Sequence, residues 1–329
     1  MTLAMPVTTH VSSPSAEPLR HGRLDRRLTQ LLDRTSDQLR ALDLSSLNDC
    51  LDALDLLRRG VGPAEWARLI ADVIAPHPVL AQLHEEPFMR RAFEKPRGYA
   101  GDAVILDFAY RHPSSRATLT RLGAALHAWK DQRAATRSVV ERRSILAAEL
   151  DAVAARREAP RVLSIACGHL REAQVSDAVQ AGAISELVAL DQDTESLAVV
   201  DREQRAFNVR VKRASVRRFV LSGAELGTFD FVYSAGLYDY LNESDANAVT
   251  AAMFRSLRPG GRLLVANFAP ELPDIGALEA IMDWHLIYRG EDAVAKLADG
   301  IPSQSIAARS ITRDRAGSVV YLTIDRTSL

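Results

Sequence analysis

The spacing of apolar residues changes at Pro160, and this change limits the fold more than any other feature of the chain. Before Pro160, apolar residues recur every three or four positions, as at Leu24, Leu28 and Leu31, and this spacing is typical of amphipathic helices. After it, short runs rich in β-branched residues alternate with helical stretches. Such alternation indicates a parallel sheet with helices on both faces. We therefore predict an all-α region followed by an α/β domain.

The strand-forming runs also indicate how the sheet ends. The last two runs, 305–314 and 318–326, are separated only by Arg315, Ala316 and Gly317, so we expect an antiparallel hairpin. The all-α region closes with a long helix from about residue 129 to 157, whose many charges we expect to face solvent. Five runs are expected to form the strands before the hairpin: 161–168, 186–193, 208–215, 229–236 and 260–268.

We divide the chain into three parts on this basis. Residues 1–22 are rich in Ser, Thr and Pro and are expected to form a disordered tail. Residues 23–157 are expected to form a helical cap that contributes to substrate binding, and residues 158–329 the α/β domain.

The composition narrows the classes of ligand. Forty-one basic and 42 acidic residues give a net charge of −1, without the electrostatic excess of a nucleic-acid binder. No run approaches the roughly 18 apolar residues of a membrane span. Two cysteines are too few for a disulfide framework and suit a reducing cytoplasm, and the histidine spacing predicts no metal site. We expect a cytoplasmic protein with a small-molecule substrate, either monomeric or a homodimer.

Two positions after the first two strands indicate a nucleoside pocket. Gly168 lies in the bend after the first strand, where the absence of a Cβ lets the backbone approach a ligand. Asp191 ends the second strand, where a carboxylate can accept both hydroxyls of a ribose. The bend lacks the G-x-G-x-x-G pattern that places pyrophosphate on a helix N-terminus. A nucleoside ligand without phosphate fits these residues better than a dinucleotide.

Residues 160–329 resemble a class I S-adenosylmethionine-dependent methyltransferase. The resemblance rests on the bend after the first strand, on FDFVYSAGLYDYL (229–241), on LRPGG (257–261) and on the terminal hairpin. It implies a Rossmann-like, seven-stranded sheet with an antiparallel C-terminal hairpin, and S-adenosylmethionine as cofactor. Carried over by position, it implies that the cofactor contacts Tyr99, Ala166, Cys167, Gly168, Asp191, Gln192, Ser215, Val216, Ser234, Ala235 and Gly236.

A narrower resemblance joins the cap to this domain. EKPRGYAGD (94–102), SAGLYDYL (234–241) and MDWHLIYR (282–289) are similar to the group that makes 3-hydroxypalmitic acid methyl ester. This resemblance implies methylation of a carboxylate on a small molecule. The densely polar and aromatic stretch 95–102 has the composition of a lid, its alternative being a plain interdomain turn. For substrate binding we select Arg97, Asp102, Asn267, Trp284, Tyr288 and Arg289.

The need for a catalytic base depends on the acceptor. A carboxylate is already ionised at neutral pH and needs none, whereas a hydroxyl or ammonium must lose a proton, and His285, Tyr238 and Asp239 are the candidates. A structural role for His285 and a surface ion pair for Arg289 are the alternatives. Two other functions stay open: N- or S-methylation of an amino acid or other metabolite, and non-catalytic cofactor binding, suggested by the glycine-poor bend.

Overall fold

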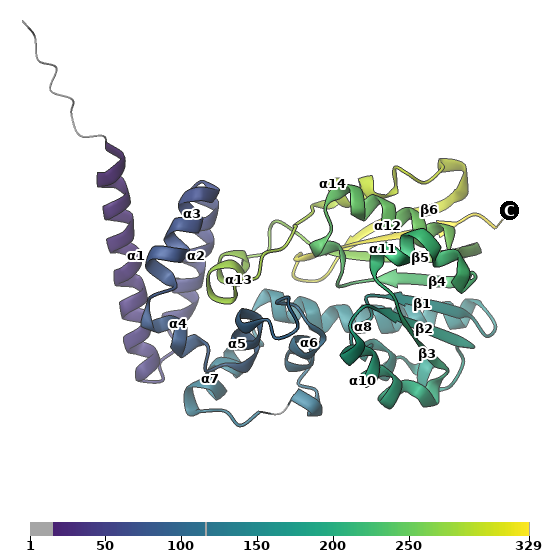
Figure 1. The fold of residues 1–329 in the computed structure, drawn as a ribbon, viewed down its shortest axis with the longest axis horizontal. Coiled ribbons are helices and arrows are strands. Elements are labelled where there is room, and N and C mark those ends of the chain that lie inside the picture. The colour runs from purple at the N-terminus through teal and green to yellow at the C-terminus, as the bar shows by residue number, and fades with distance from the viewer. Residues whose placement is uncertain (1–15, 116, 329) are drawn as a thin grey trace, which may run out of the picture.

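A computed structural model describes residues 16–115 and 117–328 and places a helical half beside a sheet half (Figure 1). Helix α1 begins at Ala16, so residues 16–22 are helical rather than part of a disordered tail, and residues 1–15 lie outside the described residues. The helices before the sheet are α1 (Ala16–Arg40), α2 (Leu47–Gly60), α3 (Pro63–Leu69), α4 (Pro78–Leu83), α5 (Pro87–Glu94), α6 (Ala103–Ala109), α7 (Arg121–Lys130) and α8 (Ala134–Arg156).

Local sequence sets the starts of these helices. Proline occupies the first turn of α3, α4 and α5, where its missing N–H costs nothing. The side chain of Asp102 accepts hydrogen bonds from the backbone amides of Val104 and Ile105 and so caps α6. The long helix expected from residue 129 is broken: α7 ends at Lys130 and α8 begins at Ala134.

The second half is one seven-stranded sheet with the order β3-β2-β1-β4-β5-β7-β6. The first five strands are parallel, and β7 pairs antiparallel with both β5 and β6, which confirms the predicted fold class and its hairpin. The segment 257–261, expected as a turn, lies within β5 as an irregularity in the β4 pairing. The strands are β1 (Arg161–Ile165), β2 (Glu186–Asp191), β3 (Val209–Arg213), β4 (Phe229–Ser234), β5 (Leu257–Phe268), β6 (Ile306–Arg313) and β7 (Val319–Arg326).

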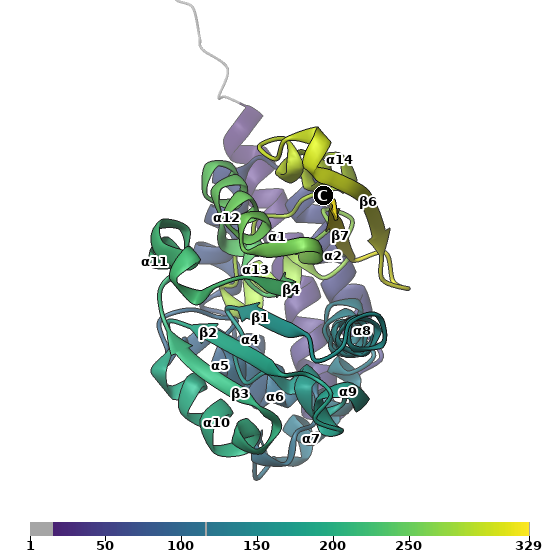
Figure 2. The ribbon, with the colours of Figure 1, turned by 90° about the vertical axis from the view of Figure 1, so that its right-hand side faces the viewer.

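Alternate residues of the strands face two different cores. Figure 2 shows helices on both faces of the sheet. Val162 and Phe231 face the side covered by α8, α9 and α10, and their core continues into the cap. Leu163 and Val232 face the side covered by α11, α12 and α14. The helices of this half are α9 (Asp177–Gln180), α10 (Thr194–Gln204), α11 (Val216–Ser222), α12 (Glu243–Arg255), α13 (Ile275–Met282) and α14 (Glu291–Ala295).

Helix α13 belongs to the α/β part of the sequence but packs among the cap helices, against α2 and α5 (Figure 1). A Cβ on Gly276 would lie 2.6 Å from the backbone nitrogen of Asp55, so only glycine permits this approach. Glu279 accepts hydrogen bonds from Arg58 and from the indole of Trp66. The cap and the α/β domain therefore interlock and share one core.

Candidate functional site

A cavity of about 510 Å³ lies where the cap meets the carboxyl ends of β1, β2 and β4. Parallel α/β sheets bind ligands at this edge. The sheet half contributes Ala166, Gly168, Leu190, Asp191, Gln192, Ala214, Val216, Gly236, Leu237, Asp239, Tyr240 and Phe268, and the cap contributes Arg97, Gly98, Tyr99, Gly101, Ala103, Leu106, Val139 and Arg142. Trp284 and Leu286, from the segment after α13, complete the lining.

The bend after β1 has an unusual backbone. Ala166, Gly168 and Leu170 all have positive φ, at 53°, 54° and 51°, and for residues other than glycine this conformation costs roughly 1–2 kcal/mol. The cap also approaches Gly168 closely: a Cβ there would lie 3.2 Å from the Cβ of Ala103. The predicted glycine thus lies in the cavity wall, with the start of α6 against it.

Asp191 links the end of β2 to this bend. Its carboxylate accepts hydrogen bonds from the amides of Gly168 and Asp193, each at 2.9 Å. Burial raises the pKa of Asp191, and the two amides act in the opposite direction. Each carboxylate oxygen has a second lone pair, so Asp191 can still accept the hydroxyls of a ribose.

The segment 95–101 crosses the cavity mouth. Arg97 pairs with Asp193 at 2.8 Å, and Lys95 pairs with Asp283. Tyr99 lies in the cavity with its ring edge-on to Tyr240, at 6.4 Å between centroids. These two ion pairs connect the first residues of the expected lid to the α/β half.

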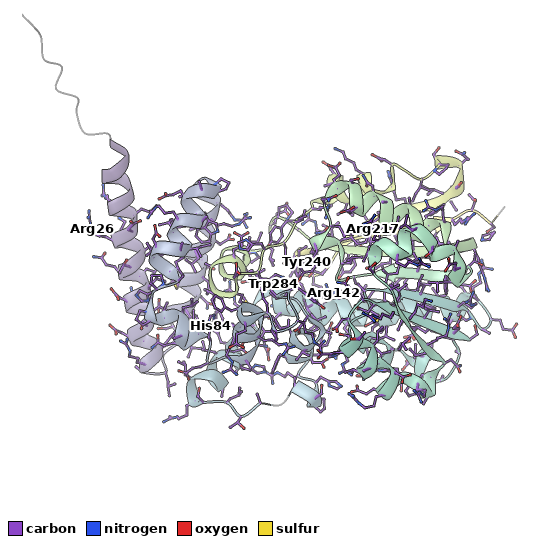
Figure 3. The ribbon with its side chains drawn as sticks, viewed as in Figure 1. Arg26, His84, Arg142, Arg217, Tyr240 and Trp284 are labelled. Carbon is purple, nitrogen blue, oxygen red and sulfur yellow. The ribbon has the colours of Figure 1, made fainter. Side chains whose placement is uncertain are left out.

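Arg142 is a cavity residue that the sequence analysis missed. Its side chain is buried and donates a hydrogen bond to the carbonyl of Ala235, and within the described residues it forms no ion pair. Figure 3 shows Arg142 with Tyr240 and Trp284 in the middle of the molecule, between the two halves. The signal was present: Arg142 precedes Leu146 and Leu150 by one and two turns, on the apolar stripe of α8 rather than on its solvated face.

Asp239 is the candidate base that lies in the cavity. Its Oδ1 accepts hydrogen bonds from the Asn267 amide and the Phe268 backbone, both at 2.7 Å. Burial raises the pKa of Asp239 to about 6, although the hydrogen bond from Phe268 and the nearby Arg142 and Arg289 oppose this rise. A carboxylate with this pKa can take up a proton near neutral pH.

The other two candidate bases are wrong on this structure. His285 is exposed and its ring contacts Asp283, outside the cavity. Tyr238 is fully buried in the core beneath α12, where its hydroxyl bonds with Thr250, and burial raises its pKa further above the usual value. A phenol in that position cannot serve as a base near neutral pH.

Four residues predicted to bind substrate make contacts within the protein, outside the cavity lining. Arg289 is buried and donates to the carbonyls of Tyr238 and Leu241 and to Asn267. Asn267 bonds in turn to Asp239. Asp102 caps α6 and pairs with Arg91 at 2.6 Å. The ring of Tyr288 packs under Arg58, away from the cavity. Arg289, Asn267 and Asp102 also lie outside the cavity lining.

The cofactor residues expected from the resemblance divide into two groups. Tyr99, Ala166, Gly168, Asp191, Gln192, Val216 and Gly236 line the cavity. The other four lie outside its lining. Ser215 caps α11, and Ser234 donates to the carbonyl of Ile165. Cys167 is buried, which raises its thiol pKa well above the usual value, and Ala235 bonds to Arg142 through its carbonyl.

A second, smaller chamber of about 50 Å³ adjoins the cavity on the cap side. Both spaces share Leu106, Val139, Phe268, Trp284 and Leu286 in their walls. The remaining wall is mostly apolar and includes Leu51, Phe88, Met89, Ala109, Trp129, Ala135, Ala277, Leu278, Ile281 and Met282. Among the described residues, no group of three or more His, Cys, Asp or Glu side chains is arranged to hold a metal ion.

The seven-stranded sheet and its order are of the Rossmann-like class. Residues 162–261 match the family described as methyltransferase domain, and this match supports S-adenosylmethionine as the methyl donor. The cavity suits this methyl donor, because Gly168 permits close approach and Asp191 offers a ribose acceptor. No curated protein matches the chain. No helix in 16–115 or 117–328 has both the length and the apolar character needed to cross a bilayer.

The chain is similar in fold to several solved structures. A protein from Bordetella parapertussis described as a possible exported protein has a TM-score of 0.60 at 17% identity, covering 96% of this chain and 100% of that one. The N-methyltransferase NodS from Bradyrhizobium japonicum has a TM-score of 0.42 at 14% identity, over 60% and 91% of the two chains. Magnesium protoporphyrin IX methyltransferase from Synechocystis has a TM-score of 0.45 at 14% identity, over 67% and 93%.

Proposed function

We propose that the protein methylates the carboxylate of a small molecule with an apolar tail, as in methyl ester formation on a 3-hydroxy fatty acid. One observation carries this proposal: the cavity that suits the cofactor shares a wall with an apolar chamber. An acceptor group placed beside Phe268 and Trp284 can extend a hydrocarbon tail into that chamber. Burying each CH₂ of such a tail is worth about 0.8 kcal/mol.

The residues of the chain account for binding and orientation. Bound S-adenosylmethionine supplies a methyl group made electrophilic by its cationic sulfur. Asp191 is placed to accept the ribose hydroxyls, and the backbone of 166–168 to contact the amino-acid end. Arg142, buried and without an ion pair among the described residues, can pair with a carboxylate in the cavity.

Exclusion of water and in-line placement then supply most of the acceleration. Tyr99, Tyr240 and Trp284 cover the cavity on the cap side, and the indole of Trp284 donates to the hydroxyl of Tyr240 at 2.9 Å. The acceptor carboxylate is ionised at neutral pH. Its oxygen would take the methyl group from the bound donor, with the departing electron pair left on the donor's sulfur, so no residue of the chain would have to accept a proton.

The position of Asp239 in the cavity supports a second candidate function, which is methylation of an amine or hydroxyl. The carboxylate of Asp239 lines the cavity with a pKa of about 6, so it can accept the proton that such an acceptor releases. The variant Asp239→Asn separates the two functions. Loss of turnover by two orders of magnitude or more supports the amine or hydroxyl acceptor, whereas turnover within about fivefold of wild type supports the carboxylate.

The direct test uses methyl-labelled cofactor with 3-hydroxy acids of graded chain length. We expect labelled product that alkali hydrolyses, as it does an ester, with a preference for longer chains. Label that resists alkali, or turnover only with amino acids, would contradict the carboxylate proposal.

We further propose a cytoplasmic location and no nucleic-acid partner, with either a monomer or a homodimer in solution. The two cysteines, Cys50 and Cys167, are both free and buried, and the net charge is −1. Fractionation of cells, gel-shift assays at low salt and light scattering test these three points in turn.

A further inference from the structure

We propose that Asp107, a cap residue outside the cavity, is a positioning residue that holds the bend after β1 in its cofactor-binding conformation. The proposal rests on the assignment of this bend to the cofactor site.

Asp107 lies on α6 of the cap and is 1% exposed. Its Oδ1 accepts a hydrogen bond from Arg171 Nε at 2.7 Å, and its Oδ2 accepts one from Arg171 Nη2 at 2.8 Å. The same Oδ2 lies 2.8 Å from Nδ1 of His169, which must be the donor because an ionised carboxylate only accepts. Asp107 thus binds His169, which lies within the bend, and Arg171, which directly follows it.

The ionisation of Asp107 agrees with this arrangement. Burial alone would raise its pKa, but the hydrogen bonds from Arg171 and His169 lower the pKa well below the usual range. The hydroxyl of Ser114 also donates to Oδ2, at 3.0 Å. His112 approaches Oδ2 at 4.0 Å, and Arg171 pairs on its other side with Glu203 of α10. A buried, charged carboxylate joins the cap to the α/β domain here.

The bend has need of such support. Two of its three positive-φ residues, Ala166 and Leu170, carry side chains that disfavour this conformation. Asp191 fixes the bend from the β2 side through the amide of Gly168. Asp107 fixes it from the cap side through His169 and Arg171. Contacts from outside the bend therefore offset the steric cost of positive φ at Ala166 and Leu170. Glycine at these two positions would not have this cost.

Calorimetric titration of the full chain with S-adenosylhomocysteine tests the proposal. We expect Asp107→Asn to weaken binding at least tenfold. The matched control is Asp25→Asn, which removes another cap carboxylate that pairs with an arginine, Arg68 at 2.6 Å, far from the bend. The control should bind within twofold of wild type.

A second substitution shows whether Asp107 acts through the backbone of the bend. Ala166→Gly removes the steric cost of positive φ, so it should recover part of the lost affinity in Asp107→Asn, by a larger factor than it changes the affinity of the wild-type protein. A merely structural role for Asp107 would show no such recovery. If Asp107→Asn fails to fold, Arg171→Lys, which removes the two-point contact, takes its place with the same expectations.

The outcomes separate this proposal from the site on which it rests. Wild-type protein that fails to bind S-adenosylhomocysteine removes the site. Wild-type binding together with an Asp107→Asn affinity within twofold overturns the positioning role, as does weakened binding that Ala166→Gly leaves unchanged.

Discussion

Asp239 accepts a hydrogen bond from the backbone amide of Phe268 at 2.7 Å. This contact holds the carboxylate in the cavity wall beside Phe268, which also lines the apolar chamber. The carboxylate is buried, and the geometry leaves it without an ion pair within the described part of the chain. Its ionisation therefore has consequences for both stability and pH dependence.

Asp239→Asn should change how stability depends on pH. The folded protein, in which the pKa of Asp239 is about 6, holds this proton more tightly than the unfolded chain, whose carboxyl titrates near 4. Wild-type stability should therefore fall as pH rises from about 4 through 6, by roughly 2–3 kcal/mol at most. Urea unfolding between pH 4.5 and 7.5 should show a smaller decline for the variant. Parallel profiles for both proteins would contradict the raised pKa, and Asp201→Asn, at a partly exposed carboxylate of α10, is the control.

Asp191→Ala should weaken cofactor binding about 100-fold. The substitution removes the proposed acceptor for the ribose and also the hydrogen bond to Gly168, and charge-assisted hydrogen bonds are worth about 1.5–3 kcal/mol each. Calorimetry with S-adenosylhomocysteine measures the change. Asp201→Ala, on the surface of α10, should have no effect, and unchanged affinity of Asp191→Ala would remove the ribose assignment.

Ala135→Leu should narrow the apolar chamber without touching the cofactor residues. Ala135 lines the chamber but not the larger cavity, so three added carbon atoms compete with the tail of the acceptor. We expect KM to rise at least tenfold for long-chain acceptors, with little change for short ones. The exposed Ala148→Leu on the same helix controls for helix effects. An equal change in KM at all chain lengths would place the tail elsewhere.

His285→Ala and Arg289→Ala should have different effects, because His285 lies on the surface and Arg289 is buried. His285 is exposed and outside the cavity, so kcat/KM should stay within twofold. Arg289 donates to three buried acceptors, and removing it leaves them unpaired at a cost of about 1–3 kcal/mol each. Thermal denaturation should show a large loss of stability for Arg289→Ala alone. A tenfold fall in kcat/KM for His285→Ala would restore its catalytic assignment.

The sheet and the closeness of Gly168 to Asp191 could be predicted from the sequence because both follow from local pattern. Strand periodicity gave the order of elements, and Gly168 and Asp191 occur at strand ends, which the topology brings to one edge. The direction in which the other side chains near that edge point could not be predicted from local pattern. Tyr238 and Asp239 are neighbours in the chain, yet one faces the core beneath α12 and the other faces the cavity.

Charge on its own gave the least reliable predictions. Arg289 and Asp102 looked like ligands for substrate because they are polar residues near conspicuous motifs. The partners of Arg289 are oxygens of other segments, and those of Asp102 are backbone amides of α6 and the side chain of Arg91. Arg142 was grouped with solvated charges although its helical spacing placed it with Leu146 and Leu150. Tertiary contacts decide such cases, and a single sequence does not display them.

All eight residues of α13 are buried, and much of what covers them comes from the first half of the chain. A fragment that began near residue 158 would expose this apolar helix to solvent. The α/β domain is therefore not expected to be stable without the cap. A related protein that lacked the cap would need a shorter or more polar connection between β5 and β6, because α13 lies in that connection.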